Sequence, residues 1–378
     1  GTRRGCTPAY LRHPRRPAFG YNQEKKKKKS TNHLFMNIID LHAEVWAQLD
    51  SRRAKLPHAL LLSGQRGIGK FDLARSFAES LLCERLTAKN EACGSCPACG
   101  WLAQGNHPDF RLVQPDALAV EEDEASETGG KKKPSQQITI DQVRALDDFL
   151  HVGTHRHGAR VVLVNPAEAM NRSTANSLLK SLEEPIASTL FILVSSEPER
   201  LLPTIRSRCQ AIVVPQPDRA RGAEWLRQAG VGDVEHWLAL AGGSPLLAVE
   251  LGSSEERVLL DALIAELARG GRLDPLSAAA SLDRIVKAEK RPAPLKRLIE
   301  WSQKWLYDLA LACEGQPLRY FGSQGATIQR LKDNAGTASV LAFNKKTLQY
   351  RMHCEQPLNS RLFLEEFFMS YAAIFRTT

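Results

Sequence analysis

Short apolar runs alternate with longer amphipathic stretches between residues 58 and 214. The apolar runs are rich in Val, Ile and Leu, as strands buried on both faces are. The stretches between them carry apolar residues three and four positions apart, which is typical of helices packed on a sheet. We therefore predict an α/β fold with a parallel sheet flanked by helices. The predicted strands are His58–Ser63, Phe110–Val113, Arg160–Val164, Thr189–Val194 and Ala211–Val214, and the predicted helices are Asp72–Leu82, Asp141–Leu150 and Thr174–Leu182.

The strand pattern stops after Pro215-Gln216-Pro217, and helical periodicity replaces it. Residues 216–254 predict a small helical unit, and residues 255–378 predict a second, larger one. The apolar stripe of the last predicted helix has the spacing of a packing face rather than of a ligand site. Residues 315–356 mix Gly, Gln, Asn and Lys without a clear period. The predicted helices are Ala220–Ala229, Val234–Ala241, Pro245–Leu251, Arg257–Ala268, Leu276–Val286, Leu295–Cys313 and Ser360–Phe375, and the stripe is Leu362, Phe363, Phe367, Tyr371 and Ile374.

Two segments carry no period at all. Residues 1–35 are rich in Pro and Arg and then in Lys, and Met36 resembles a natural start, so we interpret them as an added or upstream-derived leader rather than a functional basic tail. Residues 115–137 run from acidic to Gly- and Lys-rich, which predicts a solvated, mobile insertion. Neither segment enters the prediction of the fold.

The charge of the chain is concentrated at its amino end. The net charge is +9 and the pI about 9.2. Residues 1–35 hold ten basic residues against one acid, so the rest of the chain sums to zero. Global charge therefore does not indicate a nucleic-acid partner for the body of the protein. No apolar run approaches the roughly 18 residues of a membrane-spanning helix, so we expect no membrane partner.

Four of the eight cysteines fall within one short excursion, at Cys83, Cys93, Cys96 and Cys99. The last three form a Cys-x2-Cys-x2-Cys pattern, and glycine and proline beside them permit tight turns. Four thiolates held so closely predict a closed, structural Zn²⁺ site rather than a catalytic one. Disulfides or free thiols are the alternative, and the scattered single cysteines elsewhere disfavour disulfides.

Residues 64–71 read Gly-Gln-Arg-Gly-Ile-Gly-Lys-Phe and lie between a predicted strand and a predicted helix. This is the context of a phosphate-binding loop, in which backbone N–H groups of Gly64, Gly67 and Gly69 surround phosphates and Lys70 supplies a charge. The next residue should be Ser or Thr, whose hydroxyl binds Mg²⁺, but it is Phe71. The loop is therefore vestigial, and whether it binds nucleotide stays open.

The acidic pair that completes such an ATPase is missing as well. It should follow the strand Arg160–Val164, where an Asp holds Mg²⁺ and a Glu polarises the attacking water. Asn165 and Pro166 occupy these positions, and Glu168 lies further on, so that we expect its side chain to point elsewhere. Two losses at one reaction centre predict that the chain does not hydrolyse ATP.

One arginine near the last predicted strand is a candidate for contact with a phosphate in another subunit. Arg208 follows Ser207 and precedes Cys209 at the edge of the predicted sheet. An arginine at an edge can reach a phosphate bound by a neighbouring subunit. A surface salt bridge is the alternative, and the residues alone do not exclude it.

Several of these motifs together resemble one family. Ser207-Arg208-Cys209 is similar to the Ser-Arg-Cys motif of clamp-loader AAA+ proteins, and residues 176–185 are similar to the Asn-x-Leu-Leu-Lys-x-Leu-Glu-Glu-Pro helix of bacterial clamp loaders. The cysteine knuckle and His107-Pro108-Asp109 are shared by bacterial members. With both ATPase motifs degraded, the chain resembles the delta-prime family of these subunits, since tau/gamma members keep the Thr and the acidic pair. Leu246 also stands where AAA+ ATPases carry a sensor arginine.

The resemblance covers about residues 37–254 and fades beyond them, where Pro357-Leu358-Asn359 is similar to the family. It implies an AAA+ domain over 36–215 with a zinc module at 83–99, a helical lid over 216–254 and a helical collar for oligomerisation over 255–378. It gives Arg208 the role of an arginine finger that acts in trans on ATP bound by a neighbouring subunit. It also implies Zn²⁺ at the four cysteines.

The resemblance further implies a non-hydrolysing stator subunit of DNA polymerase III that itself neither hydrolyses ATP nor polymerises DNA. Its partners would be the tau/gamma and delta subunits, and through the complex the sliding clamp and primed DNA, in the bacterial cytoplasm. Two other functions remain open. An autonomous ATPase with unusual metal ligands such as Glu168 would turn over ATP without Arg208. A zinc-containing nucleic-acid binding protein would depend on the basic residues 1–35.

Overall fold

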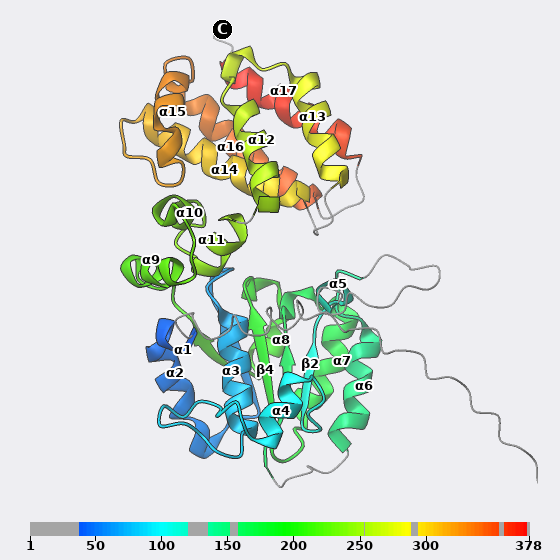
Figure 1. The fold of residues 1–378 in the computed structure, drawn as a ribbon. Helices are drawn as coiled ribbons and strands as arrows, with labels where there is room; N and C mark the ends of the chain where they lie inside the picture. The colour runs from blue at the N-terminus through cyan, green and yellow to red at the C-terminus, as the bar shows by residue number, and fades with distance from the viewer. Residues whose placement is uncertain are drawn as a thin grey trace, which may run out of the picture. The chain divides into compact units, whose positions relative to one another are not determined.

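Five parallel strands form one sheet in the described part of the chain before residue 215 (Figure 1). The computed structural model describes residues 38–119, 135–151, 158–252, 254–288, 294–354 and 359–375. The strand order is β2-β3-β4-β1-β5, so β1 lies between β4 and the edge strand β5. The parallel sheet that the sequence predicts is therefore confirmed. The strands are β1 (Ala59–Ser63), β2 (Phe110–Val113), β3 (Arg160–Val164), β4 (Thr189–Ser195) and β5 (Gln210–Val213).

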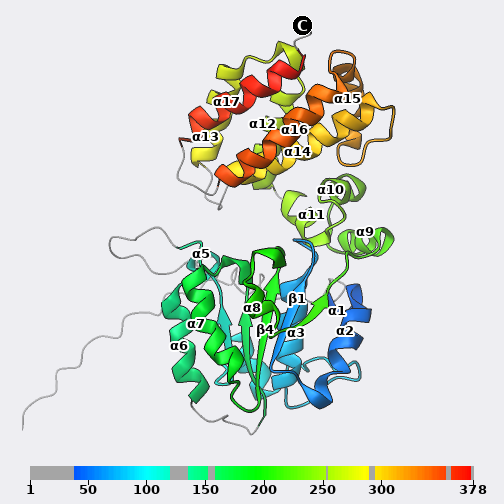
Figure 2. The same ribbon diagram turned by 180° about the vertical axis from the view of Figure 1, so that it is seen from behind.

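Alternate residues of the central strands supply two separate cores, one on each face of the sheet. Leu60 and Leu62 of β1 pack with α3 (Lys70–Leu82), whose Phe77 is fully buried. Leu61 of β1 packs on the other face with α6 (Ile140–His151) and with α7 (Arg172–Glu183), which contains Leu178. Successive side chains of a strand point to opposite faces, so a strand covered on both sides is apolar throughout. Figures 1 and 2 show α3 on one face and α6 and α7 on the other.

The predicted helices of the sheet region are present, and each begins one or two residues earlier than its apolar pattern. They are α3 (Lys70–Leu82), α6 (Ile140–His151) and α7 (Arg172–Glu183). Each helix begins at a capping residue that lies outside its apolar stripe. The side chain of Asn171 accepts a hydrogen bond from the backbone N–H of Thr174, and Gly69 precedes α3 in a left-handed conformation.

Shorter elements complete this region. They include a one-turn helix within the segment 115–137, for which the sequence predicts no structure. That prediction is therefore wrong for residues 116–119, while residues 120–134 lie outside the described residues. The elements are α1 (Ile38–Leu41), α2 (Ala43–Asp50), η3 (Arg53–Lys55), α4 (Pro97–Ala103), α5 (Asp116–Ala119), η4 (Ala167–Ala169), η5 (Pro198–Arg200) and α8 (Pro203–Arg206).

Beyond residue 215 the described chain is helical, as predicted, and a continuous apolar core runs through it. The predicted division at residue 254 stays a prediction. No helix in the described ranges is long and apolar enough to cross a membrane. The elements are α9 (Arg219–Gln228), α10 (Val234–Leu240), α11 (Pro245–Gly252), α12 (Ser254–Leu267), η6 (Gly270–Arg272), α13 (Pro275–Ala288), α14 (Pro294–Cys313), η7 (Gly322–Gln324), α15 (Gly325–Lys332), α16 (Thr337–His353), α17 (Ser360–Ala372) and η8 (Ala373–Phe375).

Two details of this region differ from the sequence prediction. The stripe of the last helix is a packing face in which Phe363, Phe367 and Tyr371 are buried. Leu362 is not part of this face, because it is 62% exposed. The region 315–356 contains a long helix, α16, that the pattern does not reveal. Apolar residues lie on both the buried and the exposed side of α16, which obscures the helical period. Residues 1–35, interpreted as a leader, lie outside the described residues.

Candidate functional site

The predicted phosphate-binding loop lies where the motif requires it. It leaves the carboxyl end of β1 at Ser63 and enters α3 at Lys70. Gly67 and Gly69 have positive φ angles of 77° and 90°, a conformation that glycine adopts without steric cost. The strand, loop and helix of a nucleotide-binding protein are therefore all present.

The loop is closed by residues packed against it. The backbone N–H of Leu246, in the first turn of α11, donates a hydrogen bond of 2.9 Å to the carbonyl oxygen of Gly67. A Cβ atom built on Gly67 would lie 2.5 Å from the Cβ of Leu247, and one on Gly69 would lie 2.2 Å from the Cδ1 of Ile38. Leu246 thus takes the place over the loop where the resemblance puts a sensor arginine, and apolar side chains cover the glycines.

Lys70 is only 5% exposed and is held by groups of the protein itself. Its Nζ donates to the carbonyl oxygen of Gln65 at 2.7 Å and to the hydroxyl of Ser196 at 3.0 Å. Burial lowers its pKa to about 8, although the nearby carboxylate of Glu168 acts in the opposite direction. Phe71 packs partly buried against the core and offers no oxygen for a metal.

Glu168 is not where the sequence analysis expects it. Its η4 segment turns back toward the loop, and its Oε1 accepts a hydrogen bond of 2.9 Å from the backbone N–H of Ser196. Its Oε2 is buried, with no hydrogen-bond partner among the described residues. The expectation that this carboxylate points elsewhere is therefore wrong. Ser196 contacts both residues, because its N–H donates to Glu168 and its hydroxyl accepts from Lys70. The negative charge of Glu168 therefore lies near the buried ammonium and balances its positive charge.

The four cysteines of the predicted metal site do converge. Their sulfur atoms all lie within 4.8 Å of one another. The sulfur of Cys83 is 3.8 Å from that of Cys96 and 3.6 Å from that of Cys99. Sulfurs about 2.3 Å from a tetrahedral zinc ion would be roughly 3.8 Å apart, so the donor set fits this metal. The separations exclude disulfides, and all four residues are free thiols. The cluster can hold a metal ion.

Backbone donors around the cluster suit thiolates. The N–H groups of Cys93 and Arg85 point to the sulfur of Cys83, at 3.2 and 3.4 Å, and the N–H of Cys99 points to Cys96. Hydrogen bonds from Ser95 lower the pKa of the Cys93 thiol to about 6. Burial acts in the opposite direction and raises the pKa of the Cys83 and Cys99 thiols, so the outer contacts mainly orient the side chains.

The loop between Cys83 and Cys93 connects the cluster to the amino-terminal helices. The indole N–H of Trp46 donates to the carbonyl oxygen of Lys89, whose ammonium is 3.0 Å from the carboxylate of Asp40. The side chain of Asn90 donates to Asp50 at 2.8 Å. These hydrogen bonds and this ion pair anchor the cysteine module to α1 and α2.

Arg208 lies at the other end of the sheet. It precedes β5, whose Gln210 is paired with Leu60 near the start of β1. Its Nη2 is 2.6 Å from Oε1 of Glu183, the last residue of α7, and its Nη1 donates to the carbonyl oxygen of Thr204. The Arg208 side chain is 33% exposed and that of Glu183 48%. The salt bridge left open by the sequence is present, and it holds the guanidinium at the surface.

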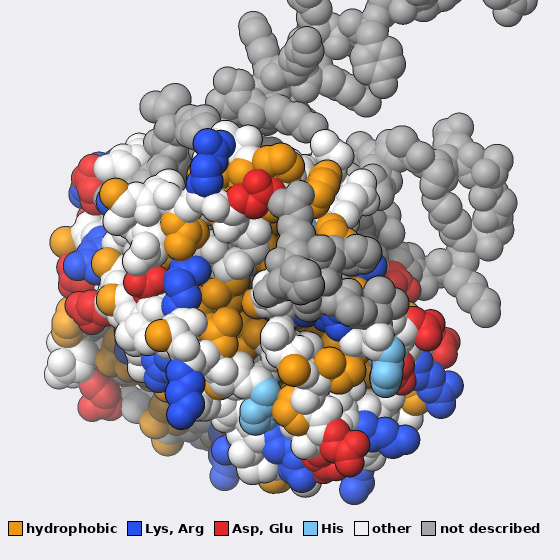
Figure 3. All heavy atoms as spheres, turned by 90° about the horizontal axis from the view of Figure 1, so that it is seen from below, with side chains coloured by type: hydrophobic (Ala, Val, Ile, Leu, Met, Phe, Trp, Pro, Cys, Tyr) orange, Lys and Arg blue, Asp and Glu red, His pale blue; other side chains and the backbone are white. Residues whose placement is uncertain are grey.

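The amino ends of the strands also enclose a hollow of about 520 Å³, lined by residues such as Leu56, Ile186 and Leu190. Figure 3 looks onto the molecule from below Figure 1, and apolar side chains gather near the middle of that face, with basic and acidic ones around them. This hollow is remote in the sheet from the phosphate-binding loop, which follows the carboxyl end of β1. It is therefore not part of the nucleotide-binding geometry.

Sequence reasoning missed the residues that contact the loop from elsewhere in the chain. Ser196 could have been found, because it follows β4, and a strand adjacent to β1 brings its carboxyl end beside the loop. No local signal identifies Leu247 or Glu183, since each acts through a partner distant in sequence. The predicted groups are otherwise brought into three separate places: the closed loop, the cysteine cluster and the surface arginine.

A parallel sheet, a phosphate-type loop with Phe71 in place of the metal-binding hydroxyl residue, and an inserted cysteine cluster define a protein built on the plan of an ATPase with a degenerate loop. Comparison with known proteins identifies the class further. The family model described as DNA polymerase III, delta subunit matches residues 42–218. DNA polymerase III subunit delta' of Pseudomonas aeruginosa is 39% identical over 353 residues, covering 89% of this chain and 98% of that protein. The chain therefore belongs to the delta-prime family of DNA polymerase III subunits.

More distant proteins match as well. DNA polymerase III subunit gamma/tau of Mycobacterium tuberculosis is 34% identical over 199 residues, which are 50% of this chain and 31% of that protein. Among solved structures, a gamma-subunit-related protein of DNA polymerase III from Thermotoga maritima covers 88% of this chain and 99% of its own, with a TM-score of 0.48 and 18% identity.

Proposed function

We propose that this chain is a non-hydrolysing stator subunit of a bacterial clamp loader. It assembles with tau/gamma and delta subunits to place the sliding clamp on primed DNA. The observation that carries the proposal is a contrast between two motifs: the phosphate-binding loop is closed by the protein's own residues, while Arg208 is held at the surface. Family membership supplies the process in which these features act.

The closed loop supports the absence of ATP turnover by this chain. Phe71 and Asn165 replace the residues that would bind Mg²⁺, and Pro166 replaces the one that would direct the water, so phosphoryl transfer lacks its metal and its base. Leu246, Leu247 and Ile38 occupy the surface that phosphates would approach. In this proposal Gly64, Gly67, Gly69 and Lys70 are vestigial and serve to join the loop to its neighbours. The purified chain is expected to show no ATPase activity.

Arg208 acts, in this proposal, on ATP bound by an adjacent subunit. A guanidinium is permanently charged and presents a planar fork of donors that suits a γ-phosphate. The carbonyl oxygen of Thr204 and the carboxylate of Glu183 hold that fork in one orientation at the protein surface. Arg208 would stabilise the charge that develops during hydrolysis in the neighbouring site.

The metal in the cysteine cluster is proposed to be Zn²⁺, held by Cys83, Cys93, Cys96 and Cys99 in a closed site. Such an ion supplies a cross-link and leaves no coordination position for chemistry. Metal analysis should find about one zinc per chain, and Cys96→Ser should lower both zinc content and melting temperature. A fully folded variant without zinc and with unchanged stability would contradict this role.

The remaining assignments follow from the same proposal. Residues 216–254 would act as the lid and residues 255–378 as the collar through which subunits assemble, after a 36–215 AAA+ domain. Contact with the clamp and DNA would be made through the complex, in the bacterial cytoplasm. The helical character of the region after residue 215 supports the lid and collar assignments, and family membership supports the remaining ones.

The test is clamp loading by a reconstituted complex of tau/gamma, delta and this chain, with the clamp and primed DNA. Arg208→Ala is compared with Arg206→Ala, an exposed arginine two positions away in the same turn. Arg208→Ala should lower ATP-dependent clamp loading by at least about ten-fold, because arginine fingers contribute large factors to turnover. Arg206→Ala should leave it near the wild-type rate.

Assembly of each variant is checked by gel filtration so that a loss of activity is not a loss of the complex. Equal activity of Arg208→Ala and Arg206→Ala in assembled complexes would exclude the arginine-finger role. ATP hydrolysis by the isolated chain would instead support an autonomous ATPase. Glu168→Gln would then be the variant to compare, because its carboxylate lies beside Ser196 and Lys70.

A further inference from the structure

A hollow surrounded by arginines lies where helices α12 and α15 end, in the helical region after residue 254. Its volume is about 740 Å³, within the usual range for a site that binds a small organic molecule. Among the described residues that line it, three are arginines and none is acidic. We call it the arginine hollow, and it is defined by Arg269, Arg272, Arg330, Leu331, Asn334 and Phe375.

A turn made of Gly270 and Gly271 separates two of the arginines along the chain. A Cβ atom built on Gly270 would lie 2.4 Å from the Cδ2 of Leu331 in α15, and one on Gly271 would lie 3.1 Å from the Cβ of Phe375 in η8. The turn is therefore packed between two other elements. Because these contacts fix the backbone of the hollow, the site is preformed, which lowers the entropic cost of binding a ligand.

Two of the three guanidinium groups have no carboxylate partner among the described residues. Arg269 is the exception, because its Nη1 lies 3.3 Å from a carboxylate oxygen of Glu266. Arg330 donates from Nη2 to the carbonyl oxygen of Ala268 at 3.4 Å, which leaves most of its five N–H donors available. Arg272 is exposed and forms no ion pair within the described ranges. The body of the chain is neutral overall, so this excess of positive charge is local.

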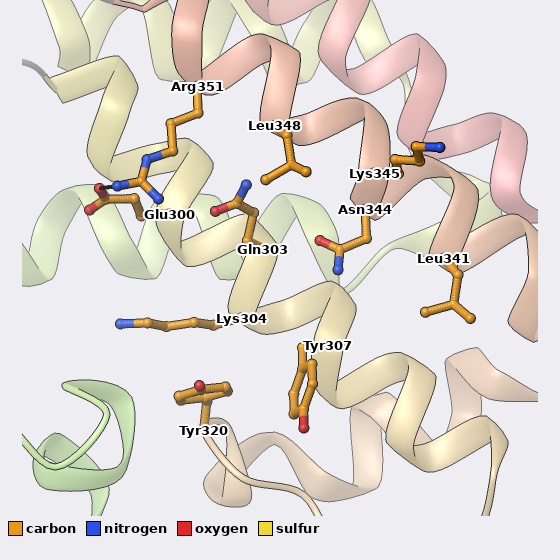
Figure 4. Close-up of a pocket in the computed structure, with 10 residues that line it drawn as sticks. All are labelled: Glu300, Gln303, Lys304, Tyr307, Tyr320, Leu341, Asn344, Lys345, Leu348 and Arg351. Carbon is orange, nitrogen blue, oxygen red and sulfur yellow. Dashed lines mark ion pairs between the residues drawn. The ribbon is translucent and has the colours of Figure 1, made fainter. Parts of the chain in front are cut away.

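A groove between α14 and α16, in the same helical region, differs from the arginine hollow in its charges. Figure 4 shows Arg351 paired there with Glu300, whose carboxylate oxygen is 3.6 Å away. The Nζ of Lys304 in that groove donates to the carbonyl oxygen of Leu240 at 2.8 Å. An anion that entered the groove would meet the carboxylate of Glu300. The arginine hollow presents no such carboxylate among its described lining residues, so it is the better anion site.

We propose that the arginine hollow binds a small organic phosphate of the nucleotide class. A guanidinium is permanently charged and presents a planar fork of N–H donors that matches phosphate oxygens. Arg272 of η6 and Arg330 of α15 hold the phosphate groups of the ligand. The amide of Asn334 can donate to a further oxygen, and Phe375 and Leu331, which are 8% and 6% exposed, form an apolar wall for the organic part.

The size of the hollow favours a free nucleotide over a nucleic acid. A volume of about 740 Å³ accommodates one small ligand, whereas a nucleic-acid strand follows a positively charged groove over several nucleotides. The inference goes beyond the proposed function, because the hollow contains neither the phosphate-binding loop nor Arg208. A bound nucleotide joins η6 to α15 and therefore stabilises the folded chain.

The test measures binding of ATP and of inorganic pyrophosphate to the full chain by titration calorimetry at physiological salt. Arg272→Gln/Arg330→Gln is compared with Arg206→Gln/Arg284→Gln, which removes the same charge from two exposed arginines outside the hollow. The hollow variant should bind ATP at least about ten-fold more weakly, because two charge-assisted contacts are lost. The control should bind as the wild type does, and ATP should raise the melting temperature of both.

A second variant separates the shape of the guanidinium from its charge. Arg272→Lys/Arg330→Lys keeps both charges but lacks the planar fork, so its affinity for ATP should lie between those of the wild type and the glutamine variant. ATP should bind more tightly than pyrophosphate, since the organic part packs on the apolar wall. Equal affinities would overturn the nucleotide assignment in favour of an inorganic phosphate chain. The basic residues 1–35 are the same in every variant and do not affect the comparison.

Several results would overturn the inference. The wild type does not bind ATP, or the control loses binding as much as the hollow variant does, which indicates non-specific attraction. Lys70→Met abolishes ATP binding that the hollow variant retains, which places the nucleotide in the phosphate-binding loop. A lower melting temperature with unchanged ATP affinity would show that the arginines only stabilise the ends of their helices. A single-stranded oligonucleotide that binds through these arginines when ATP does not would favour a nucleic acid.

Discussion

The phosphate-binding loop and the Arg208 turn lie at opposite ends of two neighbouring parallel strands, β1 and β5. Both belong to the plan of an ATPase, and they differ in what surrounds them. The loop is covered by Ile38, Leu246 and Leu247, whereas Arg208 keeps a third of its side chain exposed. The comparison shows how a vestigial motif differs from a usable one. The ligand-binding groups of the loop are packed against the protein, while the arginine that we propose to serve a partner stays accessible.

The charges at the two ends follow the same distinction. Burying the ammonium of Lys70 costs solvation free energy, and the nearby carboxylate of Glu168 offsets part of that cost. Arg208 pairs with Glu183 in a half-exposed position, where an ion pair contributes little to stability and mainly fixes geometry. A stabilising role and a positioning role can thus be separated by measuring stability and activity independently.

The largest expected effect concerns the closed loop. Gly67→Ala should destabilise the protein by about 3 kcal/mol, because a Cβ there meets Leu247 and the φ angle is positive. Gly105→Ala is the matched control. It also has a positive φ, of 73°, but no atom within 4 Å of the new Cβ, so it should cost only about 1 kcal/mol. Urea denaturation measures both, and equal costs would show that the loop is open in solution.

The pH dependence of stability tests the buried lysine. The pKa of Lys70 is about 8 in the folded protein and roughly 10.4 when unfolded, so the unfolded chain binds more protons between these values. Stability therefore rises with pH through this window. Between pH 7 and 10 the wild type should gain roughly 2 kcal/mol relative to Lys70→Met, measured by denaturation at each pH. A constant difference would mean that solvent or an anion reaches the ammonium.

The smallest expected effect concerns the surface arginine. Glu183→Gln should reduce clamp loading by the reconstituted complex about three-fold, because the guanidinium of Arg208 loses its charged partner. The exposed neighbour Glu184 supplies the control, Glu184→Gln, which should have no effect. Unfolding free energies of both variants should stay within about 0.5 kcal/mol of wild type. Faster loading by Glu183→Gln would reveal that this carboxylate restrains Arg208 instead of positioning it.

Much of the fold was predictable because its signals are local. Strands buried on both faces read as continuous apolar runs, and each predicted strand is present within one residue at either end. The cysteine cluster was predictable for a similar reason, since its four members lie close in sequence. Helix α16 was not, because the exposed Leu341 and Leu348 oppose its buried side and remove the period. Glu168 was misplaced because the path of the backbone after β3 is not encoded in spacing.

By itself, the sequence determined the parallel sheet, the replacement of metal-binding residues by Phe71 and Asn165, and the grouping of four cysteines that can hold a metal ion. These depend on residue type and on short separations along the chain. Only the tertiary structure decided that the phosphate-binding loop is closed, that Glu168 returns to Lys70 and that Glu183 holds Arg208. Each of these contacts joins residues far apart in sequence, and such contacts exist only once packing has brought their elements together.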